Sequence, residues 1–271
     1  MATTNGTTGN PTLDAFRLDG RAALVTGAGQ GIGAATALAF ADVGADVALT
    51  ARTEADLEAV AEQVRARGRR ALVLPGDVND LAHLAAVVEA TVAELGRLDV
   101  LVNNAGGSVS KPFLDTTVAQ LESSFHFNVS AAFELSRLAV PHMLDVGGGS
   151  IVNIGSVAGR NAGRGTLTHS LTKAAVAQLT RLMAADLAPR VRVNGVLPGA
   201  VETAALRRYV PEDVRDQMAA RTAMRRNGRP EDIAMAVVYM ASPAASWVTG
   251  KLLEVDGLAA EDLVPKDIAD L

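Results

Sequence analysis

From Arg21 onward, short runs of β-branched residues and leucine alternate with longer alanine-rich segments of helical spacing, and no polar linker interrupts them. This alternation predicts repeated βαβ units, in which right-handed helical crossovers join parallel strands. Seven strands are expected, at residues 22–26, 46–50, 70–74, 98–103, 150–154, 191–196 and 251–255. Because these runs are apolar almost throughout, they favour one doubly wound parallel sheet with helices on both faces.

The absence of a break also decides the domain organisation. A chain of 271 residues has room for two small domains, but one continuous sheet predicts a single α/β domain over residues 17–271. Residues 1–16 are rich in Thr, Gly and Asn and are expected to form a flexible tail without the features of a signal peptide. Thr53 and Asp56 predict a capping-box start for the second helix.

The first predicted strand runs directly into TGAGQGIGAATALAF, which places Gly27, Gly29, Gly31 and Gly33 at the start of a helix. Glycines allow a sharp turn and a close approach of a pyrophosphate, and the helix N-terminus attracts its negative charge. The spacing is G-x-x-x-G-x-G, because Ile32 stands where the strict dinucleotide motif has its last glycine. An isolated match would fit a plain tight turn equally well, but its position favours a nucleotide site.

With this turn, the chain resembles the short-chain dehydrogenase/reductase family, whose glycine motif is T-G-x-x-x-G-x-G. Further family motifs follow in order, namely Asp77 and Val78, the NNAG of 103–106, Asn128, Ser156, the loop LPGAVET of 197–203 and the closing segment of 246–257. The resemblance covers about residues 17–257. It implies a Rossmann-type domain and an NAD(P)-dependent enzyme acting on CH–OH groups.

The resemblance carries cofactor contacts over residue by residue. It implies that Asp77 and Val78 hold the adenine and that Val201 and Thr203 bind the nicotinamide carboxamide. The complete expected set is Gly27, Gly29, Gln30, Gly31, Ile32, Gly33, Arg52, Asp77, Val78, Asn104, Ala105, Gly106, Lys173, Pro198, Gly199, Val201 and Thr203. Taken alone, Asp77 would be a carboxylate of a turn or a helix cap.

The end of the second predicted strand indicates which cofactor is used. An acidic residue there accepts bonds from a free ribose 2′-hydroxyl, whereas an arginine pairs with a 2′-phosphate. The sequence reads LTAR, with Ala51 in place of a carboxylate and Arg52 next to it. NADP(H) is therefore favoured, and NAD(H) stays possible because an exposed arginine is often only solvated.

The stretch THSLTK contains a departure from the family pattern. In the family, a serine is followed thirteen residues later by a tyrosine, and the tyrosine four residues later by a lysine. Ser156 and Lys173 keep this register, so His169 stands at the tyrosine position. The resemblance implies that Asn128, Ser156, His169 and Lys173 are catalytic, and residues four apart share one helix face.

Imidazole can replace phenol in acid–base work, since its unperturbed pKa is about 6.5 against about 10 for tyrosine. Its ring is shorter, however, and the positive charge of Lys173 disfavours imidazolium, so His169 is expected to serve better as a base than as an acid. A redox site would then turn over slowly, and its turnover would either favour alcohol oxidation or depend strongly on acidity. Tyr209, in the segment that covers substrate in the family, is an alternative phenol, although a surface aromatic residue explains it more simply.

Three functions remain open from the sequence. The first is an NADP(H)-dependent oxidoreductase that interconverts a ketone and a secondary alcohol, with His169 as an active-site variant. The second is a non-redox cyclase, isomerase or lyase that uses His169 as its base. The third is a catalytically silent nucleotide-binding protein. Retention of Ser156, Asn128 and Lys173 speaks against complete loss of activity.

The composition of the chain limits the classes of partner that it is expected to bind. A net charge of -5 gives no basic field for nucleic acid or anionic lipid, and no apolar run approaches membrane-spanning length, so a small molecule is the expected partner. The lack of cysteine is compatible with a cytoplasmic location, and no metal is expected because the other histidines lack ligand spacing. The arginines of 204–229 would suit an anionic substrate, but interleaved acids favour a solvated face. The resemblance implies a dimer or tetramer.

Overall fold

The computed structural model describes residues 9–259, and its centre is one seven-stranded parallel sheet of order β3-β2-β1-β4-β5-β6-β7. The strands are β1 Ala22–Thr26, β2 Asp46–Ala51, β3 Ala71–Pro75, β4 Val100–Asn103, β5 Gly149–Ile154, β6 Val191–Pro198 and β7 Leu252–Val255. All six neighbouring pairs are parallel. The predicted sheet is confirmed, and its strand order reverses between β1 and β4, where such folds bind ligands.

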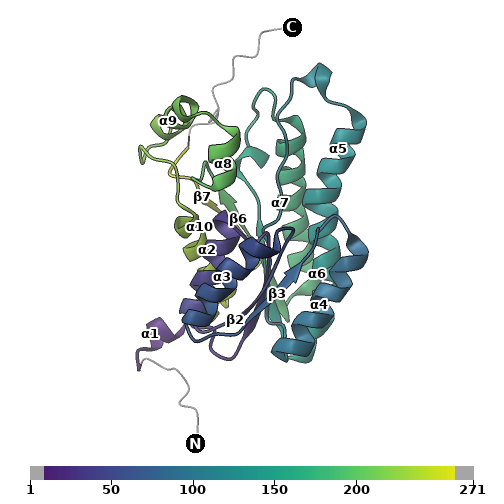
Figure 1. Ribbon diagram of the computed structural model, residues 1–271, viewed down its shortest axis with the longest axis vertical. Helices are drawn as coiled ribbons and strands as arrows, with labels where there is room; N and C mark the ends of the chain where they lie inside the picture. The colour runs from purple at the N-terminus through teal and green to yellow at the C-terminus, as the bar shows by residue number, and fades with distance from the viewer. Residues whose placement is uncertain (1–8, 260–271) are drawn as a thin grey trace, which may run out of the picture.

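Helices cover both faces of the sheet (Figure 1). One face carries α2 Gly31–Asp42, α3 Glu54–Ala66 and α10 Pro230–Ala241; the other carries α4 Leu81–Leu95, α6 Ala131–Asp145 and α7 Leu167–Leu187. Three shorter helices, α5 Val118–Phe125, α8 Ala204–Tyr209 and α9 Glu212–Ala220, lie in the upper part of the view. This arrangement gives the sheet two buried faces, as its continuous apolar strands require.

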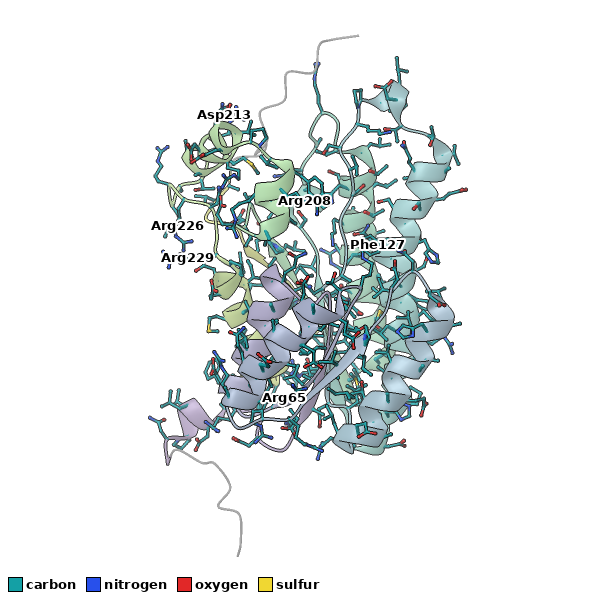
Figure 2. All side chains as sticks on the ribbon, in the orientation of Figure 1. Arg65, Phe127, Arg208, Asp213, Arg226 and Arg229 are labelled. Carbon is teal, nitrogen blue, oxygen red and sulfur yellow. The ribbon has the colours of Figure 1, made fainter. Side chains whose placement is uncertain are left out.

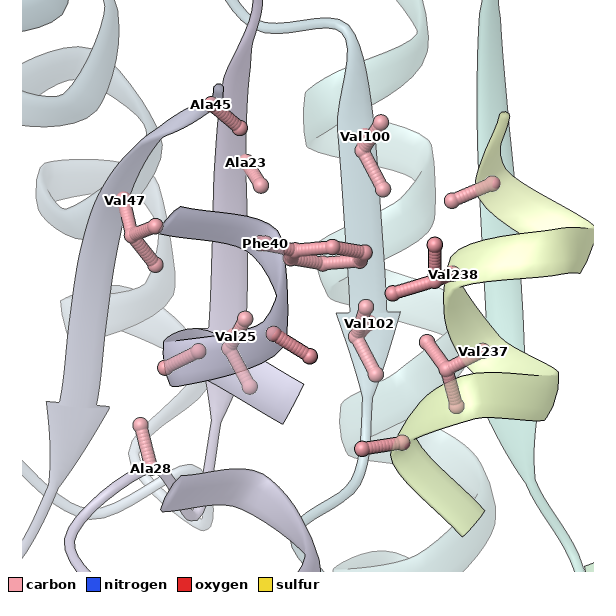
Figure 3. Packing of buried hydrophobic residues seen from close by; sticks show 14 of the residues in the cluster. Ala23, Val25, Ala28, Phe40, Ala45, Val47, Val100, Val102, Val237 and Val238 are labelled. Carbon is pink, nitrogen blue, oxygen red and sulfur yellow. The ribbon is translucent and has the colours of Figure 1, made fainter. Parts of the chain in front are cut away.

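The core follows from the alternation of side chains along each strand. On β1, Ala23 and Val25 enter the cluster under α2 and α10, whereas Ala22 and Leu24 enter the cluster under α4 and α6. Figure 3 shows the ring of Phe40, on α2, lying close to valines of β4 and α10. Burying the same strand on both sides fixes its position in the middle of the sheet.

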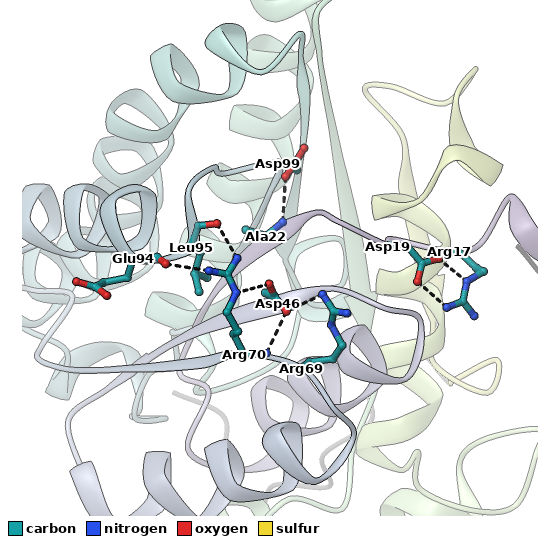
Figure 4. Close-up of polar contacts among 9 residues, drawn as sticks. All are labelled: Arg17, Asp19, Ala22, Asp46, Arg69, Arg70, Glu94, Leu95 and Asp99. Carbon is teal, nitrogen blue, oxygen red and sulfur yellow. Dashed lines mark hydrogen bonds and ion pairs between the residues drawn. The ribbon is translucent and has the colours of Figure 1, made fainter. Parts of the chain in front are cut away.

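Ion pairs tie the amino ends of the strands together (Figure 4). The Arg70 guanidinium donates to Asp46 at 2.7 Å and to the carbonyl of Leu95, at the end of α4, at 2.8 Å. The carboxylate of Asp99 accepts from the backbone N–H of Ala22 at 2.9 Å. The side chains of Arg70 and Asp99 thus bind groups at the ends of the strands. β3 begins one residue later than predicted, and β4 begins two residues later.

Two local expectations are corrected. Thr53 precedes α3, but its side chain makes no capping hydrogen bond in the described chain, so the predicted capping box is not formed. Residues 9–16 of the predicted tail are folded, because Asn10 caps the short helix α1, Pro11–Asp14, and Ala15 accepts a bond from Ala244 at 2.8 Å. The rest of that tail, and the end of the predicted domain, lie outside the described residues.

Candidate active site at the carboxyl end of the sheet

The glycine-rich turn packs too closely for side chains at two of its positions. A Cβ atom on Gly33 would lie 2.2 Å from the carbonyl oxygen of Gly27, and Gly27 itself has φ +63°. Gly31 also has positive φ, and Gln30, at the N-cap of α2, makes no side-chain capping bond in the described chain. The amino end of α2 therefore presents backbone N–H groups that the helix itself cannot satisfy.

The NNAG loop is fastened to this turn by Thr26, a residue that the sequence analysis did not single out. Its hydroxyl accepts from the backbone N–H groups of Asn104 and Ala105, both at 2.9 Å. The Asn104 amide in turn donates to the carbonyl of Thr26 at 2.8 Å. Asn104 thus holds the NNAG loop against the glycine-rich turn through backbone contacts. The sequence signal that could have predicted the role of Thr26 is its place as the threonine of the T-G motif.

The residues expected at the adenine end lie beside this loop. Val78 is buried and, with Thr26 and Ala105, lines one small hollow next to β4. Asp77 accepts two bonds from Asn79, both at 2.9 Å, which is the turn role that it would have on its own. Arg52 is exposed after β2 and has no hydrogen bond or ion pair within residues 9–259.

Asn128 lies in a π-helical stretch, His126–Ser130, between α5 and α6. Its amide donates to the carbonyl of Gly107 at 2.9 Å, and its oxygen accepts from the N–H of Gly107 at 2.9 Å. A Cβ atom on Gly106 would lie 2.7 Å from the Asn128 oxygen and 3.1 Å from the Nζ of Lys173. The structure therefore brings Asn128, Gly106 and Lys173 together at one point.

Lys173 is a buried cation without a buried carboxylate partner in the described chain. Its side chain is on α7, the residue is 6% exposed, and its Nζ donates to the carbonyl of Ile154 at 2.9 Å. Burial lowers the pKa of Lys173 to about 8. Burying a positive charge in this way lowers the stability of the folded protein. A pKa shifted by burial is typical of a residue in a functional site.

Ser156 and His169 occupy neighbouring segments at the same end of the sheet. Ser156 follows β5, and its hydroxyl accepts from the N–H of Ala158 at 3.1 Å, which leaves its own proton for another partner. His169 is half-buried in the first turn of α7, one turn before Lys173. The two segments touch, since a Cβ atom on Gly159 would lie 2.7 Å from the backbone of Lys173.

A chain of hydroxyl groups beside this site was missed by the sequence analysis. Ser108 and Thr168 are 2.6 Å apart between their hydroxyl oxygens, and Ser124 donates to Ser108 at 3.3 Å. These contacts join the loop after NNAG to the residue immediately before His169. No local pattern signals them, because Ser108 and Thr168 are 60 positions apart.

The loop after β6 reaches back to the glycine-rich turn. A Cβ atom on Gly31 would lie 3.0 Å from the methyl group of Thr203, and Thr203 caps α8 by accepting from Leu206 at 3.1 Å. Gly199, after Pro198, packs against the backbone of Asp256. Tyr209, at the end of α8, is 76% exposed, and the guanidinium carbon of Arg208 lies 5.6 Å from its ring centre.

The arrangement fits a nicotinamide dinucleotide. A turn that excludes side chains precedes an uncapped helix N-terminus, which suits a pyrophosphate. The buried Lys173 lies on α7 one turn after the imidazole of His169, and the Ser156 hydroxyl lies in the neighbouring segment after β5. Among residues 9–259, no three His, Cys, Asp or Glu side chains converge to hold a metal ion.

Comparisons with known proteins agree with this fit. The profile of a family described as enoyl-(acyl carrier protein) reductase matches residues 27–257. An uncharacterized oxidoreductase of Mycobacterium tuberculosis is 49% identical, with 90% of this chain and 94% of that protein covered. The 7alpha-hydroxysteroid dehydrogenase of Escherichia coli K12 is 39% identical, with 92% and 98% covered.

Among solved structures, a 7alpha-hydroxysteroid dehydrogenase complexed with NADH and 7-oxo glycochenodeoxycholic acid matches with a TM-score of 0.89 and 39% identity. The match covers 92% of this chain and 98% of that one. Across residues 9–259, no helix has the length and apolar character that crossing a membrane demands.

Proposed function

The chain belongs to the short-chain dehydrogenase/reductase family and is an oxidoreductase acting on CH–OH groups, and from this premise we propose that it interconverts a ketone and a secondary alcohol with NADP(H), using His169 in proton transfer. The observation that carries the proposal is the meeting of Gly106, Asn128 and the buried Lys173 one helical turn from His169. The two named relatives are an uncharacterized oxidoreductase and a hydroxysteroid dehydrogenase, which supports redox chemistry over the two other functions.

When bound, the nicotinamide supplies or accepts the hydride, and the protein's own residues handle the proton. In the oxidation direction, the Ser156 hydroxyl donates a hydrogen bond to the substrate oxygen, and a ring nitrogen of His169 accepts the alcohol proton. Lys173 supplies a positive charge for the ribose hydroxyls. Asn128 holds the loop at Gly107 in place through its two bonds, so it acts as a positioning residue.

For the cofactor, we propose that Arg52 pairs with a 2′-phosphate and that Gly27–Gly33 receive the pyrophosphate. The support is electrostatic, since Arg52 is an exposed cation and Ala51 supplies no competing carboxylate. The adenine would lie against Val78, and the carboxamide would contact Val201 and Thr203. Asp56 also lies beside Gly29, so the charges at this end of the cleft must be tested by mutation.

The test is direct. The purified protein is mixed with NADP⁺ and a panel of open-chain, cyclic and steroidal secondary alcohols, and with NADPH and the matching ketones. Nicotinamide absorbance reports hydride transfer, and product analysis reports the ketone or alcohol. Substrate conversion without any change in the nicotinamide would contradict the proposal and point to non-redox chemistry.

We also propose a homo-oligomer. Large apolar side chains are exposed on α7 and in the loop before the edge strand β7. Leu171 and Leu182 of α7 are 50% and 56% exposed, and Trp247 of that loop is 99% exposed. Such side chains favour association with a second copy. Sedimentation velocity at micromolar concentration is expected to show a dimer or tetramer, and a monomer there would contradict this.

A further inference from the structure

The covering segment, residues 204–228, joins the loop after β6 to α10 and contains α8 and α9. Met218 is its single buried apolar side chain, and α8 has no buried residue at all in the described chain. Figure 2 shows Arg208, Asp213 and Arg226 among the side chains of this part of the surface. Burial of apolar surface therefore contributes little to holding the segment, and polar contacts must hold it.

One residue outside the segment makes many of those contacts. The N–H of Glu202 donates to the carbonyl of Gly228 at 2.8 Å, and its carbonyl accepts from Arg207 at 3.2 Å. One carboxylate oxygen accepts from Asn227 at 2.7 Å and the other from Arg215, on α9, at 3.0 Å. Every polar group of Glu202 thus binds a residue of the covering segment.

The Glu202 carboxylate is the strongest of these attachments. Its side chain and that of Arg215 are 29% and 19% exposed, so their charge-assisted bond is shielded from much of the solvent. Asn227 is buried and also donates to the carbonyl of Arg215 at 3.1 Å, which closes a small ring of bonds. Removing the charge would leave the guanidinium of Arg215 without its carboxylate partner in a half-buried place.

The neighbours of Glu202 in sequence link the covering segment to the glycine-rich turn. Val201 is buried and pairs with Gly228, and the methyl group of Thr203 packs over Gly31 of the glycine-rich turn. The proposed contacts to the nicotinamide are made by Val201 and Thr203. Glu202 therefore lies between two residues that are proposed to contact the cofactor, while its own side chain binds Arg215 and Asn227 of the covering segment.

We propose that Glu202 is a positioning residue that fastens the covering segment over the substrate side of the cleft through Arg215 and Asn227. The position of the cofactor in this inference rests on the proposed function, whereas the attachment itself rests on the contacts alone. Loss of the carboxylate releases α9 and leaves Thr203 on the glycine-rich turn. Substrate KM is then expected to rise more than the cofactor Kd.

Limited trypsin digestion tests the attachment without needing activity, because the covering segment contains six tryptic sites, at Arg207, Arg208, Arg215, Arg221, Arg225 and Arg226. In Glu202→Gln, cleavage within this segment is expected to be about tenfold faster than in the unchanged protein, as for loss of one partly exposed charge-assisted bond. Glu212→Gln is the matched control: it removes one charge from the exposed start of α9, where the described chain offers no partner. The control should be cleaved at the original rate.

The outcomes separate the two proposals. Cleavage of Glu202→Gln at the original rate, in a folded protein, overturns the inference whatever the activity. If Glu202→Gln does not fold, Arg215→Met breaks the same bond from the other side, and cleavage at Arg207 and Arg208 gives the same test. Faster cleavage in a protein that binds no nicotinamide cofactor would support the attachment and overturn the proposed function. For active protein, a raised substrate KM with nearly unchanged kcat is expected, and equal losses in Glu212→Gln would contradict the role.

Discussion

Replacing Lys173 by methionine should stabilise the protein at neutral pH while impairing its activity. The side chain is 6% exposed, and within residues 9–259 its positive charge has one hydrogen bond, to the carbonyl of Ile154 at 2.9 Å. Methionine fills a similar volume without a charge. The trade between stability and function at this position follows from the burial of an ammonium group that the fold itself does not need.

The magnitude follows from the pKa. Burial lowers the pKa of Lys173 from its ordinary 10.5 to about 8, which costs about 3 kcal/mol while the lysine is charged in both states. Methionine avoids this cost but also loses the hydrogen bond to Ile154, which lowers the stability of the variant by about 1 kcal/mol. At pH 7, Lys173→Met is therefore expected to unfold with a free energy about 2 kcal/mol higher than the unchanged protein.

The pH dependence has a definite sign. Between pH 8 and 10.5 the folded protein releases the Lys173 proton while the unfolded chain keeps it, so the unchanged protein gains stability as pH rises. The advantage of Lys173→Met is fully present below pH 8, should vanish at pH ~9.5, and should become a deficit of about 1 kcal/mol by pH 10.5, where only the lost hydrogen bond to Ile154 still counts. Urea unfolding of both proteins across this range measures the difference, in which other titrating groups cancel. A difference that is constant with pH, or a less stable variant at pH 7, would refute the reasoning.

Two further predictions concern the cofactor. Gly33→Ala places a Cβ atom 2.2 Å from the Gly27 carbonyl oxygen and should weaken NADPH binding at least ~tenfold, as measured by fluorescence titration. Gly163→Ala is the control, because its Cβ atom would have its nearest contact at 3.3 Å, with a hydroxyl oxygen, and it should not weaken binding. Equal effects of the two substitutions would contradict the close-packing argument. Arg52→Ala should raise the Kd for NADPH about tenfold and leave that for NADH nearly unchanged, as for loss of one charge-assisted pair, and a parallel change in both would exclude the phosphate role.

The sequence was a good guide wherever the signal is local. Alternating apolar runs predict the strands, because burial on both faces demands them, and the sheet is as expected. The turn at Gly33 was visible because a close backbone approach needs glycine. The Thr53 capping box failed because the same residue types also suit an uncapped loop, and Asp56 packs against Gly29 instead.

What the sequence did not predict depends on contacts between distant segments. The Ser108–Thr168 pair joins the loop after NNAG to the start of α7, 60 residues further along the chain. Asn128 lies in a π-helical stretch from which its amide contacts Gly107, and no residue pattern predicted that stretch. Glu202 lay within a recognised motif, but its partners in the covering segment emerge only when the chain is folded.

The central claim is that His169 serves a redox cleft at a position where the family has tyrosine, and His169→Tyr tests it most directly. The variant, the unchanged protein and His169→Phe are compared for NADP(H)-dependent turnover on the same alcohols and ketones, after cofactor binding has been shown for all three. The account predicts a large gain in kcat for His169→Tyr, weaker activity for the unchanged protein and none for His169→Phe. No gain in His169→Tyr, with cofactor still bound, would contradict the account and assign the histidine to chemistry without hydride transfer.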